Sequence, residues 1–283
     1  MYSLASDTKL SREFFYKNHD KGTGNSPPSS KELRKLTDLW GKVVQDYTNR
    51  QVSVGSDKLN AISGIADDFQ RYLGGSRYLA GLWEHSLPRD LLWKRSQGTP
   101  LPRPIPKEPS INAPSWSWAS INGRVDPGLY FKRSAVFNCE IIDCQVQPKD
   151  QNAPFGETAS GSLKLRARAK EVLWCPDDTF IHQRKSNGEF VRIAKGYLDP
   201  VDNLIAMKEE NSFLALPLVL KTVDSPYEPV RRSGGPERNL LGLLVVKDKI
   251  GEWYRRVGYF DCRFEDTSEE VFAVGEQWEL IIR

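Results

Sequence analysis

The spacing of apolar residues changes near Trp118, and this change constrains the fold more than any other feature of the sequence. Before it, apolar residues recur at steps of three and four, as on one face of a helix. They form two stripes: Leu33, Leu36, Trp40, Val43 and Tyr47, then Leu59, Ile62, Ile65, Ala66 and Phe69. After it, residues 162–170 alternate between apolar and basic side chains, as in a half-buried strand. We therefore expect an α+β fold, with an N-terminal helical segment packed on a C-terminal antiparallel β sandwich or barrel.

Polar residues and glycines mark where the helices begin and end. Ser29 followed by Glu32 fits a capping box, and Asp57 fits the N-cap of the second helix. Gly74-Gly75 follows the second stripe, where glycine commonly ends a helix. Two further short helices are expected, over residues 76–84 and 88–93.

The second half of the chain is expected to consist of strands and turns. Asn122-Gly123 predicts a tight hairpin. In the strand over residues 136–146, Ile142, Cys144 and Val146 should share one face. The apolar run over residues 213–220 is short and contains Pro217, so it predicts a buried strand, expected over residues 213–222. The other strands are expected at residues 162–170, 190–194, 240–247, 252–260 and 278–282, with turns at 224–236 and 265–270.

These patterns divide the chain into four parts. Residues 1–28 are expected to be a poorly ordered segment, and residues 29–96 a helical region. Residues 97–114 contain many prolines and predict a stiff, extended link packed over the surface. The alternative for this link is a ligand for a proline-reading module. Residues 115–283 are expected to be the β-rich region.

Composition narrows the functional classes. Lys plus Arg is 40 and Asp plus Glu is 37, so the net charge of +3 argues against nucleic-acid binding. The sequence begins without an apolar leader, and we expect the four cysteines to be reduced thiols in an intracellular, cytoplasmic protein. No apolar run is long enough to predict a membrane span.

Few residues carry a signature of chemistry. Cys139 and Cys144 are five apart in one expected strand, so they should face opposite sides, and the histidines are scattered. No nucleophile elbow or phosphate-binding loop is present. We therefore expect no metal and no cofactor. The basic face of Lys164, Arg166, Arg168 and Lys170 is interpreted as the wet side of an edge strand rather than a phosphate-binding track.

Tryptophans gather where the two halves meet. Trp116 and Trp118 are two residues apart, so they point the same way if residues 115–118 form a strand. Together with Trp83 and Trp93 they should form one cluster at the junction. Such a cluster is more often a core than a binding surface, and an exposed pair would instead contact a protein partner or stack on a ligand ring.

Several stretches, among them residues 57–66 and 254–258, resemble the region downstream of the HET domain in fungal heterokaryon incompatibility proteins, and three carry most of the resemblance. They are residues 76–84 (Ser-Arg-Tyr-Leu-Ala-Gly-Leu-Trp-Glu), 91–93 (Leu-Leu-Trp) and 113–120 (Ala-Pro-Ser-Trp-Ser-Trp-Ala-Ser). The resemblance runs from about residue 33 to the C-terminus. The positions that carry it include Asp57, Lys58, Arg77, Tyr78, Gly81, Pro114, Ser115, Ser117 and Gly258.

The resemblance implies a non-enzymatic interaction or regulatory module that serves self/non-self recognition and programmed cell death. Its partner would be a protein, such as a relative that carries a HET domain. The motifs of the death-inducing HET core do not occur in this chain, and Trp40-Gly41 lies in a different context, so no activity of that core is transferred. Two alternatives are a hydrolase whose aromatic-lined site forms on folding, with Asp57 or Glu84 as base, and an inactive fragment of a longer HET protein.

Overall fold

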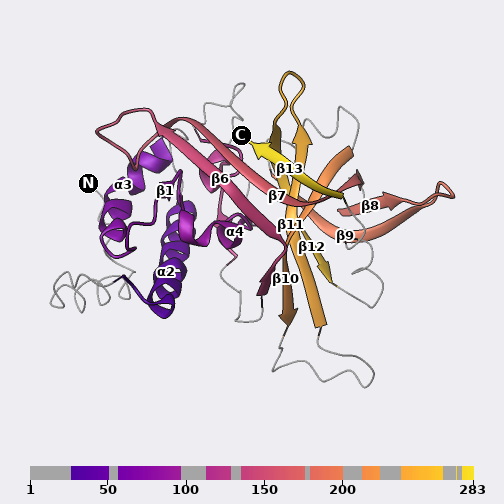
Figure 1. Cartoon of the computed structure of the whole chain (residues 1–283), viewed down its shortest axis with the longest axis horizontal. Coiled ribbons are helices and arrows are strands. Elements are labelled where there is room, and N and C mark those ends of the chain that lie inside the picture. Colours follow the sequence, from indigo (N-terminus) through magenta and orange to yellow (C-terminus); the bar gives the residue numbers. More distant parts are fainter. Residues whose placement is uncertain are drawn as a thin grey trace.

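The computed structural model describes residues 27–50, 57–96, 113–128, 135–175, 179–199, 212–223, 237–263, 272 and 276–283. A helical region lies beside one large sheet (Figure 1). Residues 1–26 of the expected N-terminal segment, most of the proline-rich link and the turns at 224–236 and 265–270 lie outside the described residues. The coarse expectation of helices first and an extensive sheet afterwards is confirmed.

Two helices form as their apolar stripes predict. Helix α2 (Ser30–Thr48) begins at the capping box of Ser29 and Glu32, which is confirmed, and it buries Leu36, Trp40 and Tyr47. Helix α3 (Lys58–Gln70) buries the side chains of Leu59, Ile62, Ala66 and Phe69. Asp57 occupies its N-cap position, but its side chain makes no capping hydrogen bond.

The helix expected over residues 76–84 is wrong. Strands β1 (Tyr78–Leu79) and β2 (Leu82–Trp83) form a hairpin there, followed by the 3-10 helix η2 (Glu84–Ser86) and by α4 (Leu87–Asp90). The two turn residues, Ala80 and Gly81, have φ angles of 50° and 96°. Two successive positive φ angles produce a tight hairpin turn and cannot occur in a right-handed helix. Helix α4 also starts one residue earlier and ends three residues before the expected 88–93.

The strand expected at Ser115–Trp118 is also wrong. Residues 115–117 form a turn, which leads into the 3-10 helix η3 (Trp118–Ser120). Asn122-Gly123 forms no hairpin, because the strand that follows, β4 (Val125–Asp126), pairs with β3 (Lys94–Arg95). The amide of Val125 also donates to Thr48 Oγ1 at 3.0 Å, so this segment is attached to α2 rather than to the sheet.

One nine-stranded sheet contains the rest of the described chain. The strands expected from residue 162 onward are confirmed, and β8 was not predicted. The single strand expected over residues 136–146 is wrong, because the chain breaks at Asn138 into β5, which pairs with β10, and β6, which pairs with β7. Every pairing is antiparallel except the contact between β12 and β13. The strands are β5 (Ala135–Phe137), β6 (Cys139–Pro148), β7 (Thr158–Cys175), β8 (Phe180–Arg184), β9 (Phe190–Leu198), β10 (Ser212–Val223), β11 (Glu237–Lys247), β12 (Tyr254–Arg263) and β13 (Glu276–Ile282).

Strand β7 is the central strand, not the edge strand expected from its basic face. It pairs along its length with β6, β13, β10 and β8. Its apolar residues Leu163, Leu165 and Ala167 are completely buried, as the alternation predicts. On the other face, Arg166 forms ion pairs with Glu140 of β6 at 2.5 Å and Glu279 of β13 at 2.6 Å. Neighbouring strands therefore neutralise charge on this face, which argues against a phosphate-binding track.

A bulge in β6 corrects the prediction for the cysteines. The register with β7 shifts between Ile141 and Asp143, so Ile142 is left exposed. Because an inserted residue reverses the alternation, Cys139 and Cys144 both pack toward the same core instead of opposite faces. All four cysteines are described and free, and burial raises the pKa of Cys139 and of Cys144 to about 12.

The helical region and the sheet share one core. A single cluster of buried apolar residues includes Leu36 of α2, Trp83 of β2, Leu165 of β7 and Ile282 of β13. The β6–β7 hairpin also extends over the helical region (Figure 1), where the amide of Glu157 donates to Asn60 Oδ1 at 3.0 Å. Within the described residues, no helix has the length and apolarity that a bilayer crossing requires.

Candidate functional site

The four tryptophans singled out by the sequence lie in the interior. Trp83, Trp93, Trp116 and Trp118 are each at most 1% exposed and belong to the core cluster that joins the two halves. We call them, together with Trp40, the tryptophan junction. In this conformation no ring of the junction offers a face to solvent, so contact of these rings with a partner stays a prediction.

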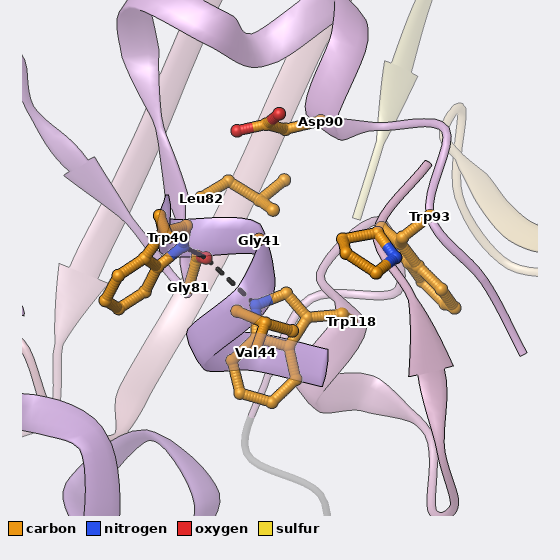
Figure 2. A pocket seen from close by; sticks show the side chains of 9 residues that line it. Trp40, Gly41, Val44, Gly81, Leu82, Asp90, Trp93 and Trp118 are labelled. Atoms are coloured by element: carbon orange, nitrogen blue, oxygen red, sulfur yellow. Dashed lines mark hydrogen bonds between the residues drawn. The ribbon is translucent and has the colours of Figure 1, made fainter. Parts of the chain in front are cut away.

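The carbonyl of Gly81 is the central acceptor of the junction. It accepts hydrogen bonds from Trp40 Nε1 at 2.8 Å and from Trp118 Nε1 at 2.9 Å (Figure 2). A Cβ atom on Gly81 would lie 2.5 Å from Trp118 Nε1, well inside contact distance. Only glycine therefore allows the hairpin turn to approach the indole this closely.

Two serines of the same stretch connect the junction to distant elements. Ser117 Oγ donates to the Ala80 carbonyl at 2.5 Å and accepts from the amide of Ala119 at 3.0 Å. Ser115 Oγ accepts from the amide of Arg256 at 3.0 Å and donates to the carbonyl of Arg283. These contacts explain why the segment forms a turn. The two serine hydroxyl groups form hydrogen bonds with backbone groups, and such local side-chain bonds compete with the backbone pairing of a strand.

Arg256 crosses from β12 into the junction and is the main residue that sequence reasoning missed. Its guanidinium lies 3.3 Å from the ring centre of Trp93 and donates to the carbonyls of Leu91 at 2.8 Å and Trp93 at 2.6 Å. It also pairs with Asp199 at 3.1 Å, and both side chains are at most 4% exposed. Burial raises the pKa of Asp199, and the positive charge of Arg256 opposes that rise.

Lys58 binds the backbone at the C-terminal end of the segment that contains Trp116 and Trp118. Its side chain is buried, and its Nζ donates to the carbonyls of Ala119, at 3.3 Å, and Ile121. Burial lowers the pKa of Lys58 to about 8. Lys58 therefore fixes the 119–121 backbone on the first turn of α3.

A small cavity lies among Trp40, Trp93, Trp118 and Asp90 (Figure 2). Its volume is about 20 Å³, which suits one water molecule and is far below the size of ordinary ligand pockets. Burial raises the pKa of Asp90 to about 6, while Ser86 Oγ donates to its carboxyl group at 2.6 Å. The junction thus holds a perturbed carboxyl group, but it has no room for a substrate.

Asp90→Asn is expected to raise the free energy of unfolding at pH 7 by about 1–2 kcal/mol, because ionised Asp90 is poorly solvated and asparagine is neutral. In the wild type the native state binds the Asp90 proton more tightly than the unfolded state. The contribution of Asp90 to stability therefore falls as pH rises from 3.8 to about 6. Urea titrations at several pH values measure both effects. The exposed Asp67→Asn serves as control, and an unchanged pH profile in Asp90→Asn would contradict this account.

The remaining motif residues are structural or surface groups. Tyr78 packs edge-on against Trp83 at 5.1 Å, and a Cβ atom on Gly258 would meet the Tyr197 carbonyl at 2.6 Å. Pro114 packs closely on Gly161 of β7. Arg77 pairs with Glu84 at 2.6 Å on the surface, and this hydrogen bond lowers the pKa of Glu84. The lowered pKa makes Glu84 a weak base, and its side chain faces solvent, so it is unsuited to the general base of the hydrolase alternative.

The geometry describes a rigid junction that joins two halves of one core. In the parts of the chain that the structure describes, no three or more side chains of His, Cys, Asp and Glu come together as a metal site would need. No sequence pattern predicted a role in the site for Asp90, Asp199 or Arg256, because their importance comes from burial beside residues far away in the chain. Comparison of this chain with protein-family models, with curated proteins and with solved structures found no match.

Proposed function

We propose that this chain is a protein-interaction module of a heterokaryon-incompatibility-like protein. The tryptophan junction would fix its helical half, and the partner would bind at the edge strand β5. We also propose that the sheet is a barrel: its pairings run from β7 through β8, β9, β12, β11 and β10 and return to β7. Strand β5 stands outside this ring, because it continues the sheet only beyond β10.

The exposure of β5 carries the proposal. Val136 is 58% exposed and Phe137 is 44% exposed. Consecutive strand residues point to opposite faces, so both faces of this strand are apolar and open. Strand β5 pairs with β10 and with no other described strand. Stable proteins usually protect such edges with charges or a cover, and an apolar open edge is the surface to which an extended partner segment adds.

The proposed occupant is an extended apolar segment of a HET-domain relative. The experiment measures binding between this chain and a purified full-length HET-domain protein by titration calorimetry. Wild type is expected to bind, and Val136→Lys plus Phe137→Lys is expected to weaken binding at least tenfold, because each lysine would lie against the added strand.

Ile250→Lys is the matched control, because Ile250 is 98% exposed in the turn between β11 and β12, far along the sequence from β5. It should bind like wild type, and both lysine variants should keep the wild-type unfolding midpoint. Binding by the folded double variant at wild-type strength would refute strand addition at β5. No binding by wild type would refute the choice of partner.

A further inference from the structure

His85 occupies the centre of a hydrogen-bonded group that the tryptophan junction does not use. Ser76 lies just before β1, His85 lies in η2 just after β2, and Thr37 lies on α2. His85 Nδ1 lies 2.8 Å from Ser76 Oγ, and His85 Nε2 lies 3.0 Å from Thr37 Oγ1. The β1–β2 hairpin thus brings a serine and a histidine together at its open end.

The direction of these hydrogen bonds follows from Thr37. Its hydroxyl donates its one proton to the carbonyl of Leu33 at 2.8 Å, so Thr37 Oγ1 can only accept from His85 Nε2–H. A neutral His85 then carries its lone pair on Nδ1, which accepts the proton of Ser76 Oγ–H. This is the order of a serine nucleophile, a base and a group that orients the base.

The surroundings keep His85 neutral and leave Ser76 partly covered. Burial, followed by the charge of Arg89 on α4, lowers the pKa of His85, and the charge of Glu84 opposes this. Arg89 is itself paired with Asp38 of α2 at 2.7 Å. Ser76 is half-buried and follows the exposed Gly74-Gly75. The backbone amide of His85 donates to Ser76 Oγ at 3.2 Å, which holds the serine hydroxyl beside the imidazole ring.

We propose that Ser76 is a nucleophile that accepts acyl groups from small activated esters, with His85 as its general base and Thr37 as a positioning residue. Ser76 Oγ would attack the ester carbonyl while its proton passes to His85 Nδ1. The C–O bond to the alcohol breaks, and the alcohol leaves with that proton. Water then attacks the acyl-Ser76 ester, releases the acid and restores the hydroxyl. This activity goes beyond partner binding at β5.

The experiment treats the full chain with a fluorophosphonate, in which Ser76 Oγ would replace fluoride on phosphorus, and maps the adduct by mass spectrometry. Wild type is expected to give one adduct, on Ser76. Ser76→Ala should lose it, and His85→Gln should slow labelling about 100-fold. Ser63→Ala is the control and should label like wild type, because Ser63 Oγ donates to the Asn60 carbonyl and contacts no histidine.

The pH profile separates activation from simple exposure. Labelling of wild type should rise with pH through a midpoint below 6.5, as His85 loses its proton, and Thr37→Val should shift this midpoint as well as slow the reaction. The pH dependence of wild-type labelling tests the role of His85 even if His85→Gln unfolds. Folded wild type that is unlabelled, or labelled at Ser63 as fast as at Ser76, overturns the proposal. Labelling and partner binding are read at different residues, so either can fail alone.

Discussion

Arg256→Ala is expected to lower the free energy of unfolding by about 3–5 kcal/mol, the usual cost of removing one partner from a buried ion pair. The change leaves the buried carboxylate of Asp199 without its counter-charge. It also removes the donors to the carbonyls of Leu91 and Trp93 and the ring contact with Trp93. Chemical denaturation followed by tryptophan fluorescence measures the loss and reports on the junction itself.

Two further variants test whether the loss of stability in Arg256→Ala comes from the burial of the ion pair. Arg71 pairs with Asp67 on the surface of α3, where the two side chains are 66% and 52% exposed, so Arg71→Ala should cost about 0.5 kcal/mol or less. Arg256→Ala combined with Asp199→Asn should recover part of the stability, because no uncompensated charge then remains. A loss from Arg256→Ala as small as that from Arg71→Ala would contradict the proposed importance of the buried pair.

Gly81→Ala is expected to destabilise the protein by about 3 kcal/mol. The φ angle of 96° disfavours any side chain, and the new Cβ would lie 2.5 Å from Trp118 Nε1. The indole must then move away, and its hydrogen bond to the Gly81 carbonyl is weakened. Thermal unfolding should show a lower midpoint, and near-ultraviolet circular dichroism should show a changed tryptophan environment.

Gly75→Ala separates the cost of the positive φ angle from the cost of the contact with Trp118. Gly75 has a φ angle of 89°, close to that of Gly81, but a Cβ atom there would meet nothing within 4 Å. This control should therefore show the backbone cost alone, about 1 kcal/mol. Equal losses for the two variants would mean that the close approach to Trp118 contributes nothing measurable.

Regular elements with long apolar patterns were predictable from the sequence. The stripes of α2 and α3 and the alternation in β7 each extend over many residues, so local exceptions do not obscure them. The β1–β2 hairpin was missed because Leu79, Ala80 and Leu82 are good helix formers, although Gly81 between them is not. The positive φ angles at Ala80 and Gly81 produce the turn. The alternating Ser-Trp-Ser-Trp pattern is typical of a strand, but the hydrogen bond from the Ser117 hydroxyl to the Ala80 carbonyl holds the segment in a turn.

The candidate sites were predictable to different degrees. The gathering of the tryptophans followed from their positions near the change of pattern, and all of them lie in one core cluster. The buried pair of Arg256 and Asp199 could not be predicted, because the two residues are 57 positions apart and charged residues are usually on the surface. The contact of Ser76 with His85 could not be predicted either, because it requires the β1–β2 hairpin, where the sequence predicted a helix.

The shared core has a consequence for how the chain is made. Trp93 and Trp116 are translated early, but the guanidinium that stacks on Trp93 belongs to residue 256, and Ile282 of the same core comes later still. A nascent chain on the ribosome therefore holds a set of large aromatic side chains whose final neighbours have not yet been synthesised. We expect such a chain to depend on chaperones until β12 and β13 emerge, because exposed apolar surface in an incomplete fold promotes aggregation.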